Sequence, residues 1–514
     1  MQTVVKKLFC DVAVIGGGVG GCSAALTASR RGLQTMIFEK GVSLGGLATN
    51  GFVPQVAGMI EGNCQEFVDR LAAVDRLRVH SEIDKHNPSF DPEWGKIVLE
   101  NMLMENGVRI IYDATCIDVE MEDKKVKCAI FFTKGGYVAV YADYFIDATG
   151  DADLCAMAGA RYQVGGQDFC GLNMSTTLGS RWRGYNKPEY EAANAKFRQE
   201  QLDAGKEPKD VLPLIYALEE EAIKNGELAR HVANRFNGIF QVRLPHCEDD
   251  DIEFCTFSFH SYFTRNTDVE DISRQVIEQR QLMQQFETFA RKHVPGYENI
   301  RIVGTGGLPG VRDSRRIFGE YMLKASDIAC GVKFEDGIAR FPEMFDAHHP
   351  TSSELVFMRH IHIPAPGGTA VCRDPQCTAQ MHPFGRPAGI EARPSPRDYC
   401  EIPYRSLLPK GLDNILAVGR CCSAEFHANG AMRIIGPAMG TGQAAGVAVA
   451  MAFYAGVRPA DIDGKEVRRV LIEEEKVSLD KFPEGWWSIL RDQPGEFRVN
   501  WGDFIAIVPP EENK

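Results

Sequence analysis

The sequence contains no hydrophobic run long enough to cross a membrane. Its longest apolar stretch, residues 444–454, is much shorter than the ~20 residues that a membrane-spanning helix needs. Residues 11–18 are apolar and lie close to the N-terminus. We therefore see no basic segment followed by a long hydrophobic one, which is the pattern of a secretory signal. We therefore expect a cytoplasmic protein with no membrane partner.

Positive charge is also in short supply. The chain has 57 lysines and arginines against 70 aspartates and glutamates, which gives a net charge of −13. Such a chain is a poor partner for nucleic acid unless it has a local basic patch, and no basic stripe is visible. Hydrophobic residues are 44% and charged residues 25%, a globular composition that excludes disorder and collagen-like repeats. No nucleic-acid partner is predicted.

The cysteines lack the pattern of a disulfide framework. Their number, 15, is odd, and they are scattered along the chain, which indicates reduced thiols. Cys372 and Cys377, with His382 beyond them, suggest a metal site, but zinc pairs are usually closer together and a fourth ligand is not evident. A loop is the preferred interpretation, and no metal is predicted. Cys421 and Cys422 are adjacent; because vicinal disulfides are strained, we interpret them as buried small residues beside a ligand.

Glycine, in contrast, is abundant. The chain has 50 glycines, nearly one residue in ten against the usual ~7%. Residues 8–15 predict a buried strand that leads into Gly16, Gly18 and Gly21 and then a helix. In this motif the first glycine permits a tight turn, the second lets the backbone approach a pyrophosphate, and the third lets helix and strand pack closely. The free N–H groups of the helix N-terminus would face the phosphates.

The next strand and loop extend this dinucleotide site. Glu39 ends a predicted strand at residues 33–39, 18 residues after Gly21, where an acid hydrogen-bonds a ribose diol and disfavours the 2′-phosphate of NADP. A second glycine loop follows at residues 41–51, and Asp147-Ala-Thr-Gly150-Asp151 ends a later strand. Two more glycine segments near the first suggest that the ligand extends beyond its pyrophosphate toward a bulky ring.

Other segments also show clear periodicity. Residues 114–146 alternate like a β-meander, residues 238–264 and 414–418 read as strands, and no internal repeat is evident. The expected helices are 92–106, several within 187–236, 268–293, 441–455 and 466–476. The helix at residues 441–455 is expected to follow a glycine loop at residues 436–442, and its N-terminus would be a second anion-binding site.

Five segments together resemble the FAD-dependent oxidoreductases of the glutathione-reductase-type fold that carry a GG-x-A-T-x-G segment and a C-terminal flavin loop. They are DVAVIGGGVGGCSAALTASRRG, EKGVSLGGLATNG, YFIDATGDADL, GVRDSRRIFGEY and EIPYRSLLPKGLDNILAVGRCCSAEFHANGAMRIIGPAMGTGQAAG, and the resemblance runs from residue 8 to about 476. It implies an α/β fold: a Rossmann-like FAD-binding domain with a β-meander, plus an inserted α+β substrate or cap domain.

The resemblance also implies the cofactor and its contacts. FAD would meet Gly419 and Arg420 along its ribityl chain, and Gly440-Thr441-Gly442 would open a helix whose positive end stabilises charge on the reduced flavin. A covalent link to FAD would need a histidine or cysteine near the second glycine loop. No histidine follows Glu39 closely, and Cys64, the nearest cysteine after the loop, lies too far along the chain, so noncovalent FAD is favoured. The predicted cofactor-binding residues are Gly16, Gly18, Gly21, Glu39, Lys40, Gly45, Gly46, Thr49, Gly150, Asp151, Gly419, Arg420, Gly440, Thr441 and Gly442.

The domain boundaries follow from these segments. They are 1–160 for the first part of the FAD-binding domain, 161–300 for the substrate or cap domain, 301–345 for a return toward the FAD domain, 346–402 for the second part of the cap, 403–478 for the C-terminal part of the FAD domain and 479–514 for a tail with three tryptophans. The tail is expected either to pack on the cap or a second subunit, or to dock on a partner.

Four residues are candidates for chemistry on a substrate. His427 is a candidate acid or base, and Arg433 a candidate for holding a carboxylate or a developing enolate; alternatively His427 only hydrogen-bonds the cofactor, and Arg433 pairs with Glu425. Arg312 lies in a run of arginines, some of which we expect in structural ion pairs. The remaining candidate is His260. Further histidines and tyrosines with weaker claims are His348, His349, His360, His362, Tyr262 and Tyr404.

Three hypotheses of function remain open. The first is an FAD-dependent oxidoreductase that moves hydride to or from a small organic substrate. Residues 304–307 contain glycines, but the sequence after them does not suit a phosphate-binding helix, so a separate electron carrier is expected in place of NAD(P)H, and a homo-oligomer is open. The second is a tRNA-modifying flavoprotein, which the acidic charge disfavours. The third is a flavin-binding subunit of a larger redox complex.

Overall fold

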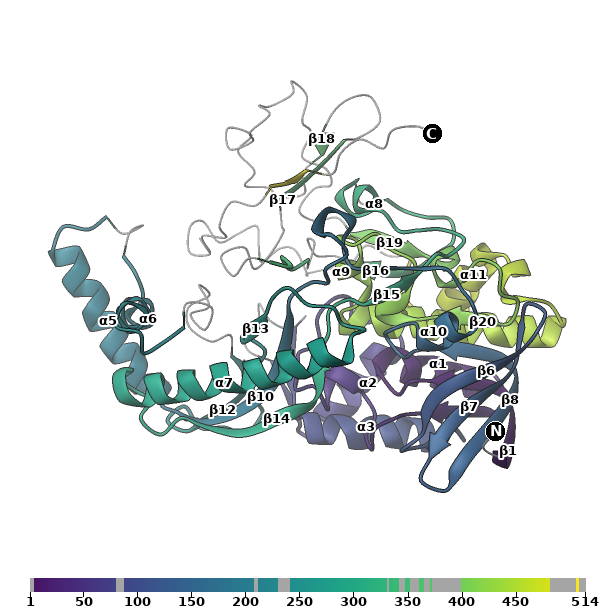
Figure 1. Ribbon diagram of the computed structural model, residues 1–514, viewed down its shortest axis with the longest axis horizontal. Coiled ribbons are helices and arrows are strands. Elements are labelled where there is room, and N and C mark those ends of the chain that lie inside the picture. The colour runs from purple at the N-terminus through teal and green to yellow at the C-terminus, as the bar shows by residue number, and fades with distance from the viewer. Residues whose placement is uncertain are drawn as a thin grey trace.

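A seven-stranded sheet and a five-stranded sheet carry the fold (Figure 1). The computed structural model describes residues 4–79, 87–207, 211–229, 241–330, 332–341, 347–351, 360–364, 370–371, 399–480 and 505–507. Its helices are α1 (Val19–Arg30), α2 (Asn63–Ala73), α3 (Pro92–Glu105), α4 (Asp153–Met157), α5 (Lys187–Asp203), α6 (Leu214–Lys224), α7 (Val269–His293), α8 (Ala325–Cys330), α9 (Asn429–Met432), α10 (Ile435–Ala455) and α11 (Gly464–Glu473).

The larger sheet combines segments from both ends of the chain. Its order is β5-β2-β1-β8-β7-β6, and β20 pairs with β8. The strands are β5 (Arg109–Ile111), β2 (Thr35–Phe38), β1 (Val4–Ile15), β8 (Gly136–Asp147), β7 (Lys125–Thr133), β6 (Thr115–Glu122) and β20 (Ile415–Ala417). The first four and β20 run parallel, whereas β6, β7 and β8 form an antiparallel meander. The sequence-based expectation of a Rossmann-like domain with a meander is confirmed.

Both faces of this sheet are covered. Val12 and Val14 of β1 pack against a helical layer that includes α1 and α10, whereas Ala13 and Ile15 point to the opposite face. Burial on both faces explains why residues 8–15 read as an apolar run without strict alternation. Among the described residues, no helix combines the length and the apolar character that a membrane crossing requires.

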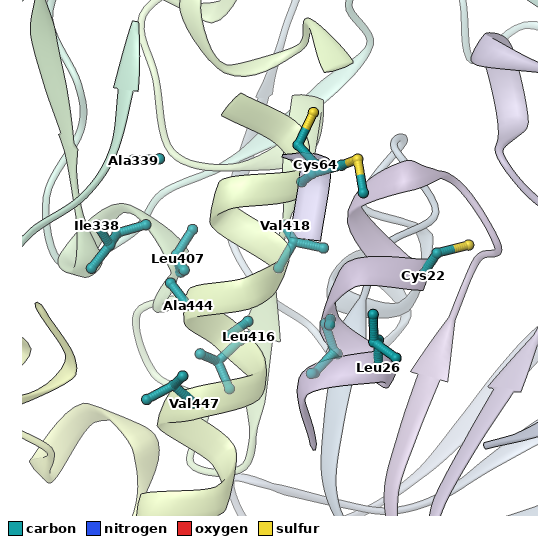
Figure 2. Close-up of a cluster of buried hydrophobic side chains, with 14 of the residues drawn as sticks. Cys22, Leu26, Cys64, Ile338, Ala339, Leu407, Leu416, Val418, Ala444 and Val447 are labelled. Atoms are coloured by element: carbon teal, nitrogen blue, oxygen red, sulfur yellow. The ribbon is translucent and has the colours of Figure 1, made fainter. Parts of the chain in front are cut away.

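Helices α1 and α10 lie side by side because small residues line their contact. A Cβ at Gly442 would overlap the carbonyl oxygen of Gly20, and one at Gly446 would stand 2.7 Å from the carbonyl oxygen of Ala24. Figure 2 shows Val418 between α10 and α1. The glycines of α10 therefore serve a close approach of two backbones.

This packing corrects one expectation. We expected residues 436–442 to form a loop and Gly440-Thr441-Gly442 to open the helix, but α10 begins at Ile435 and runs unbroken to Ala455. Pro437 sits in the first turn, where a proline is compatible with a helix. The physical reason for the error is that a run of glycines reads as a loop in the sequence, whereas here α1 takes the space that side chains would fill.

The inserted lobe is the second sheet with its helices. Its strands are β11 (Val242–Arg243), β12 (Ile252–Thr256), β10 (Thr176–Tyr185), β13 (His260–Ser261) and β14 (Arg301–Gly310), with order β11-β12-β10-β13 and β14 on β10. Helix α7 lies along this sheet, as Figure 1 shows in teal. Asp268 caps α7 by accepting a hydrogen bond from the Asp271 N–H at 2.9 Å. The helix ends before Pro295, as predicted.

Several short strands form small sheets of their own. They are β9 (Tyr162–Val164) with β15 (Arg315–Ile317), β16 (Gly337–Phe341) with β19 (Cys400–Pro403), β3 (Leu77–Arg78) with β4 (Ser89–Phe90), and β17 (His360–Pro364) with both β18 (Ala370–Val371) and β21 (Ile505–Ile507). Strand β14 belongs to the inserted sheet, although the expected boundary placed its residues in the returning segment. Its Gly307 N–H donates to Asn50 O at 2.9 Å, which joins this sheet to the loop after residue 49.

One carboxylic acid is buried in the core of the inserted lobe. Glu219 on α6 is 2% exposed, and neither carboxyl oxygen has a hydrogen-bond partner among the described residues. Burial, with a smaller contribution from the charge of Glu220, raises the pKa of Glu219 to about 8. Near neutral pH the folded protein therefore holds Glu219 in its protonated form.

We expect Glu219→Gln to flatten the pH dependence of stability. Because the folded pKa lies above the unfolded one, the free energy of unfolding should fall by about 1.4 kcal/mol per pH unit from ~4.5 to about 8 and then level off. Glutamine has no proton to lose and removes this slope. Urea unfolding at several pH values measures it, with the exposed Glu221→Gln as matched control. Parallel profiles for wild type and Glu219→Gln would contradict the prediction.

Candidate active site

The first glycine turn separates structural glycines from one that faces open space. Gly16 has φ +106°, and a Cβ there would overlap Ala148 O, while a Cβ at Gly21 would overlap Gly16 O. These two positions are fixed by protein packing. A Cβ at Gly18, the N-cap of α1, would meet nothing within 4 Å. The space before the α1 N-terminus is therefore open at the position where a pyrophosphate was expected.

Glu39 braces the same turn. One carboxylate oxygen accepts a hydrogen bond from the Gly17 N–H at 2.7 Å, and the other accepts from the Gly41 N–H at 2.7 Å. The side chain is 8% exposed, whereas the neighbouring Lys40 is exposed. Glu39 thus ties the end of β2 to the glycine turn.

The second glycine loop packs directly on the first. The Gly45 N–H donates to Gly17 O at 2.8 Å, and Gly45 and Gly46 both have positive φ, 93° and 54°. Thr49 is fully buried and its hydroxyl donates to Leu44 O, which closes the loop. The two glycine segments that the sequence suggested for one ligand are therefore neighbours in space.

Asp151 and Arg420 meet at the end of β8. Arg420 Nη2 lies 2.8 Å from Asp151 Oδ1, which also accepts from the Ser314 hydroxyl at 2.6 Å. Burial alone would raise the pKa of Asp151, but Arg420 and Ser314 outweigh it and hold that pKa below its usual value. Arg420 Nε is buried and has no hydrogen-bond partner among the described residues. An unused buried donor here fits a polar ligand with acceptor oxygens.

Thr441 on α10 supports the segment at residues 419–420. The Gly419 N–H donates to the Thr441 hydroxyl oxygen at 3.1 Å, so α10 positions the segment that carries Arg420. Gly440 and Gly442 lie within the second turn of α10, not at its N-terminus. For these two residues the structure gives a packing role, because Ala339 and Gly20 occupy the adjacent space.

The structure brings His260 and Arg312 together at a third residue, Ser175. His260 Nδ1 lies 3.0 Å from Ser175 Oγ, and Arg312 Nη1 donates to the Ser175 carbonyl oxygen at 2.8 Å. All three residues are buried. Ser175 precedes β10, His260 begins β13 and Arg312 follows β14, so three strands of the inserted sheet converge here.

One hydrogen bond joins the segment that carries His427 and Arg433 to the Arg312 segment. Asn429 Nδ2 donates to Arg312 O at 3.4 Å, which anchors the start of α9 on the Arg312 segment. His427 is 6% exposed and its ring meets the Phe426 ring edge-on at 5.4 Å. Arg433 is half-buried and close enough to Asp313 for its charge to lower the pKa of that carboxyl.

Asp313 and Arg316 form the framework of this cluster. Both are fully buried, and Arg316 Nη1 lies 3.0 Å from Asp313 Oδ2. Asp313 also accepts from Asn173 Nδ2 at 2.9 Å and from the Met174 N–H at 2.6 Å, next to Ser175. Burial raises the pKa of Asp313, with Arg316 and these hydrogen bonds opposing it. The sequence indicated ion pairs in this run but not which arginine makes the buried one.

Sequence reasoning missed Ser175 and Asn173. The available signal was a polar run, Asn173-Met-Ser-Thr-Thr177, at the start of a strand that is otherwise buried. Polar groups gathered at a strand end are typical of a site. The partners of these residues lie 85 to 140 residues away along the chain, so no local pattern could have connected them.

The weaker candidates differ in their surroundings. Tyr262 and His348 stack on His260, whereas Tyr404 donates its hydroxyl to Pro459 O at 2.8 Å and is a core residue. His349 Nδ1 accepts from the Thr351 N–H at 3.1 Å, and burial lowers its pKa. For two of the histidines, only the backbone is described: His360 and His362 on β17. Outside the described residues lie Cys372, Cys377, His382 and most of the tail.

The thiols and acids of the described residues offer no metal site. No group of three or more His, Cys, Asp or Glu side chains within the described ranges is arranged to hold an ion. Cys421 and Cys422 are free thiols and fully buried, and burial raises the pKa of Cys421 well above its usual value.

These features define a class of protein. A long dinucleotide suits four of them: the open position at Gly18, the braced Glu39, the paired glycine loops and the unused Arg420 donor. The polar cluster is joined to this region by the hydrogen bond from the Ser314 hydroxyl to Asp151. A Rossmann-type fold with this site is typical of dinucleotide-binding proteins.

The comparison with protein families makes the assignment specific. The model of the family described as FAD dependent oxidoreductase matches residues 11–471. The chain therefore belongs to the FAD-dependent oxidoreductase family, and its cofactor is FAD.

Individual relatives are more distant. The tRNA uridine 5-carboxymethylaminomethyl modification enzyme MnmG of Finegoldia magna is 31% identical over 140 residues, which are 23% of this chain and 21% of that protein. Among solved structures, a geranylgeranyl bacteriochlorophyll reductase-like protein of Thermoplasma acidophilum is 13% identical, with TM-score 0.41 and coverage of 91% and 84% of the two chains. The myxobacterial chondrochloren halogenase CndH is 10% identical, with TM-score 0.40 and coverage of 91% and 79%.

Proposed function

We propose that this protein is a dehydrogenase or reductase that transfers hydride between noncovalently bound FAD and a small organic substrate. The observation that carries the proposal is the meeting of His260 and Arg312 at the buried Ser175, beside the run in which Ser314 bonds to the Asp151–Arg420 pair. Bound FAD would supply hydride transfer. The chain would supply acid–base and orienting groups from this cluster.

The polar cluster suits acid–base work beside a hydride centre. An imidazole can exchange a proton near neutral pH, and a guanidinium can hold a carboxylate or a developing enolate oxygen. His427 and His260 would exchange the proton, while Arg433 and Arg312 would orient the substrate.

Two observations support noncovalent FAD and a separate electron carrier. Cys64, the first cysteine that follows the second glycine loop in the sequence, is 1% exposed and packed in the core on α2. Gly304, Gly306 and Gly307 lie inside β14 and not in a turn that opens a helix, so they give no second nucleotide site. Electrons would then enter or leave through the substrate or another protein.

Anaerobic bleaching of the flavin tests the proposal. The purified protein should absorb near 450 nm or gain that absorbance with added FAD, and at least one substrate in a panel of small organic acids, amines and alcohols should bleach it. His427→Ala and Arg433→Ala should keep FAD but lose about 100-fold or more of the bleaching rate. Loss of FAD in these variants would make the residues cofactor ligands, and absence of flavin would refute the proposal.

One observation favours a second candidate, a tRNA-modifying flavoprotein. The 140-residue match to MnmG is the sequence evidence for it, whereas the net charge of −13 opposes binding of a polyanion. Copurification of tRNA, with binding that weakens steeply as salt rises, would favour this candidate over the first.

A further inference from the structure

The glycines of β14, which form no nucleotide site, lie against the second glycine loop. A Cβ at Gly306 would stand 3.2 Å from Asn50 O and 3.3 Å from Gly179 O. A Cβ at Gly179 would overlap Gly51 O, and the Gly307 N–H donates to Asn50 O at 2.9 Å. Strands β10 and β14 therefore meet this loop backbone to backbone. We call this contact the glycine seam; its members are Gly51, Gly179, Gly306 and Gly307.

A side chain next to the seam also holds the loop on the inserted sheet. Phe52 follows Gly51, and its φ of +53° lies in the left-handed region, which phenylalanine rarely adopts. Its ring packs against the cluster of Val242, Leu244 and Cys255 in the inserted lobe. A backbone conformation of this kind persists only where the surrounding structure holds it. The end of the loop is therefore fixed to the inserted sheet by its backbone and by a side chain.

The beginning of the same loop lies at the expected cofactor position. Gly45 forms an isolated parallel bridge with Gly18, and a Cβ at Gly46 would stand 3.2 Å from Gly18 Cα. A Cβ at Gly18 itself would meet nothing within 4 Å, because that residue borders the open space before α1. Within the loop, the Gly51 N–H donates to Gly46 O at 3.1 Å. One hydrogen-bonded loop thus contacts the glycine turn with its first residues and the inserted sheet with its last.

We propose that residues 45–52 couple FAD binding to the inserted sheet through the glycine seam. Bound FAD restrains the first residues of the loop, and the hydrogen bond from Gly51 to Gly46 extends that restraint to the seam. Strands β10 and β14 then close on a fixed surface, which moves more freely when FAD is absent. Because coupling between two sites is reciprocal, a seam that cannot close must also weaken FAD binding.

The strands at the seam also carry part of the polar cluster. Ser175 directly precedes β10 and Arg312 follows β14, and the two strands pair near these ends through Thr177 and Gly310. An inserted sheet that closes on the loop when FAD is bound would assemble this cluster in the loaded enzyme. That consequence rests on the proposed function, whereas the coupling itself requires only FAD binding.

Gly306→Ala tests the proposal, and Gly304→Ala is the matched control on the same strand. A methyl group at Gly306 would press on backbone atoms of residues 50, 51 and 179, whereas the nearest atom at Gly304 is in the Phe52 ring at 3.7 Å, an ordinary contact. Neither glycine has a positive φ, so alanine suits both backbones. In FAD titrations of the folded apoprotein, we expect Gly306→Ala to weaken binding about 10-fold and Gly304→Ala less than about twofold.

Hydrogen–deuterium exchange gives a second readout that needs no substrate. In wild type and Gly304→Ala, saturating FAD should slow the exchange of amides in β10 and β14 about 10-fold, in addition to those of the loop. In Gly306→Ala saturated with FAD, the loop should be protected while β10 and β14 should exchange as in the apoprotein.

Three results would overturn the proposal. They are wild-type FAD affinity in Gly306→Ala, FAD protection of β10 and β14 that survives in this variant, and the absence of that protection in wild type. The last of them is decisive even if Gly306→Ala does not fold. If wild type shows the protection but no substrate bleaches its flavin, the coupling stands and the proposed function fails.

Discussion

Replacing Gly18 with valine is expected to weaken FAD binding at least about 100-fold while the apoprotein keeps its unfolding midpoint within about 2 °C. Gly18 has φ −64° and ψ 170°, an extended conformation that valine adopts readily, and a Cβ there meets nothing within 4 Å. The side chain would instead fill the space before the α1 N-terminus. Charge-assisted hydrogen bonds to phosphate contribute about 1.5–3 kcal/mol each, so losing one or two accounts for the effect.

Gly21→Ala is the matched contrast to Gly18→Val. The new methyl would overlap Gly16 O and lie 2.9 Å from Ala148 Cβ, so the turn itself would have to move. We expect this variant to lower the unfolding midpoint of the apoprotein, which Gly18→Val does not. FAD titration by fluorescence quenching and thermal unfolding by circular dichroism separate the two effects. Wild-type FAD affinity in Gly18→Val would mean that the dinucleotide approaches another part of the turn.

Local signals explain why the first half of the site was predictable. The β1-turn-α1-β2 unit is contiguous, and each residue type in it answers a constraint set by neighbours within some twenty residues. The outer glycines of the turn are needed by the chain itself and the middle one leaves open space, as the motif implies. Glu39 also lies where the pattern placed it, at the end of β2.

Closely spaced glycines in a sequence do not show whether a ligand or another helix approaches the backbone. The glycines at residues 436–442 looked like a loop at the cofactor because closely spaced glycines indicate close approach, and Gly446 lies just beyond them. In the structure the approaching group is the backbone of α1, since Gly442 faces Gly20 and Gly446 faces Ala24. The sequence states that space is needed but not what occupies it, and the answer depends on contacts more than 400 residues apart.

The polar cluster was predictable only in part, for the same reason. His260, Arg312, His427 and Arg433 could be named as residue types suited to chemistry, but the meeting of His260 and Arg312 at Ser175 depends on hydrogen bonds across 85 and 137 residues. Within the run Asp313-Ser-Arg-Arg316, the two arginines also have different partners and different exposure. Arg316 is fully buried, whereas Arg315 pairs with Asp153 nearer the surface.

Arg316→Met is expected to destabilise the protein by about 3–5 kcal/mol, the largest stability effect we predict. Removing one partner of a buried pair leaves the other charge without compensation. Asp313 would stay in a site where its side chain has no exposure, and Arg316 would also release Gly165 O and Ala424 O, which it now holds at 2.7 and 3.1 Å. Urea unfolding of the FAD-free protein measures the change.

Two further variants separate the charge effect from the loss of a long side chain. Arg315→Met removes the same groups from the next residue, where the pair with Asp153 is partly exposed, and should cost no more than about 1 kcal/mol. Adding Asp313→Asn to Arg316→Met removes the stranded charge, so the double variant should be more stable than Arg316→Met alone. Equal stability of the two would show that the lost backbone hydrogen bonds, and not the buried charge, determine the effect. Because Asp313 holds the Met174 N–H beside Ser175, Arg316→Met should also slow flavin bleaching at temperatures where it remains folded.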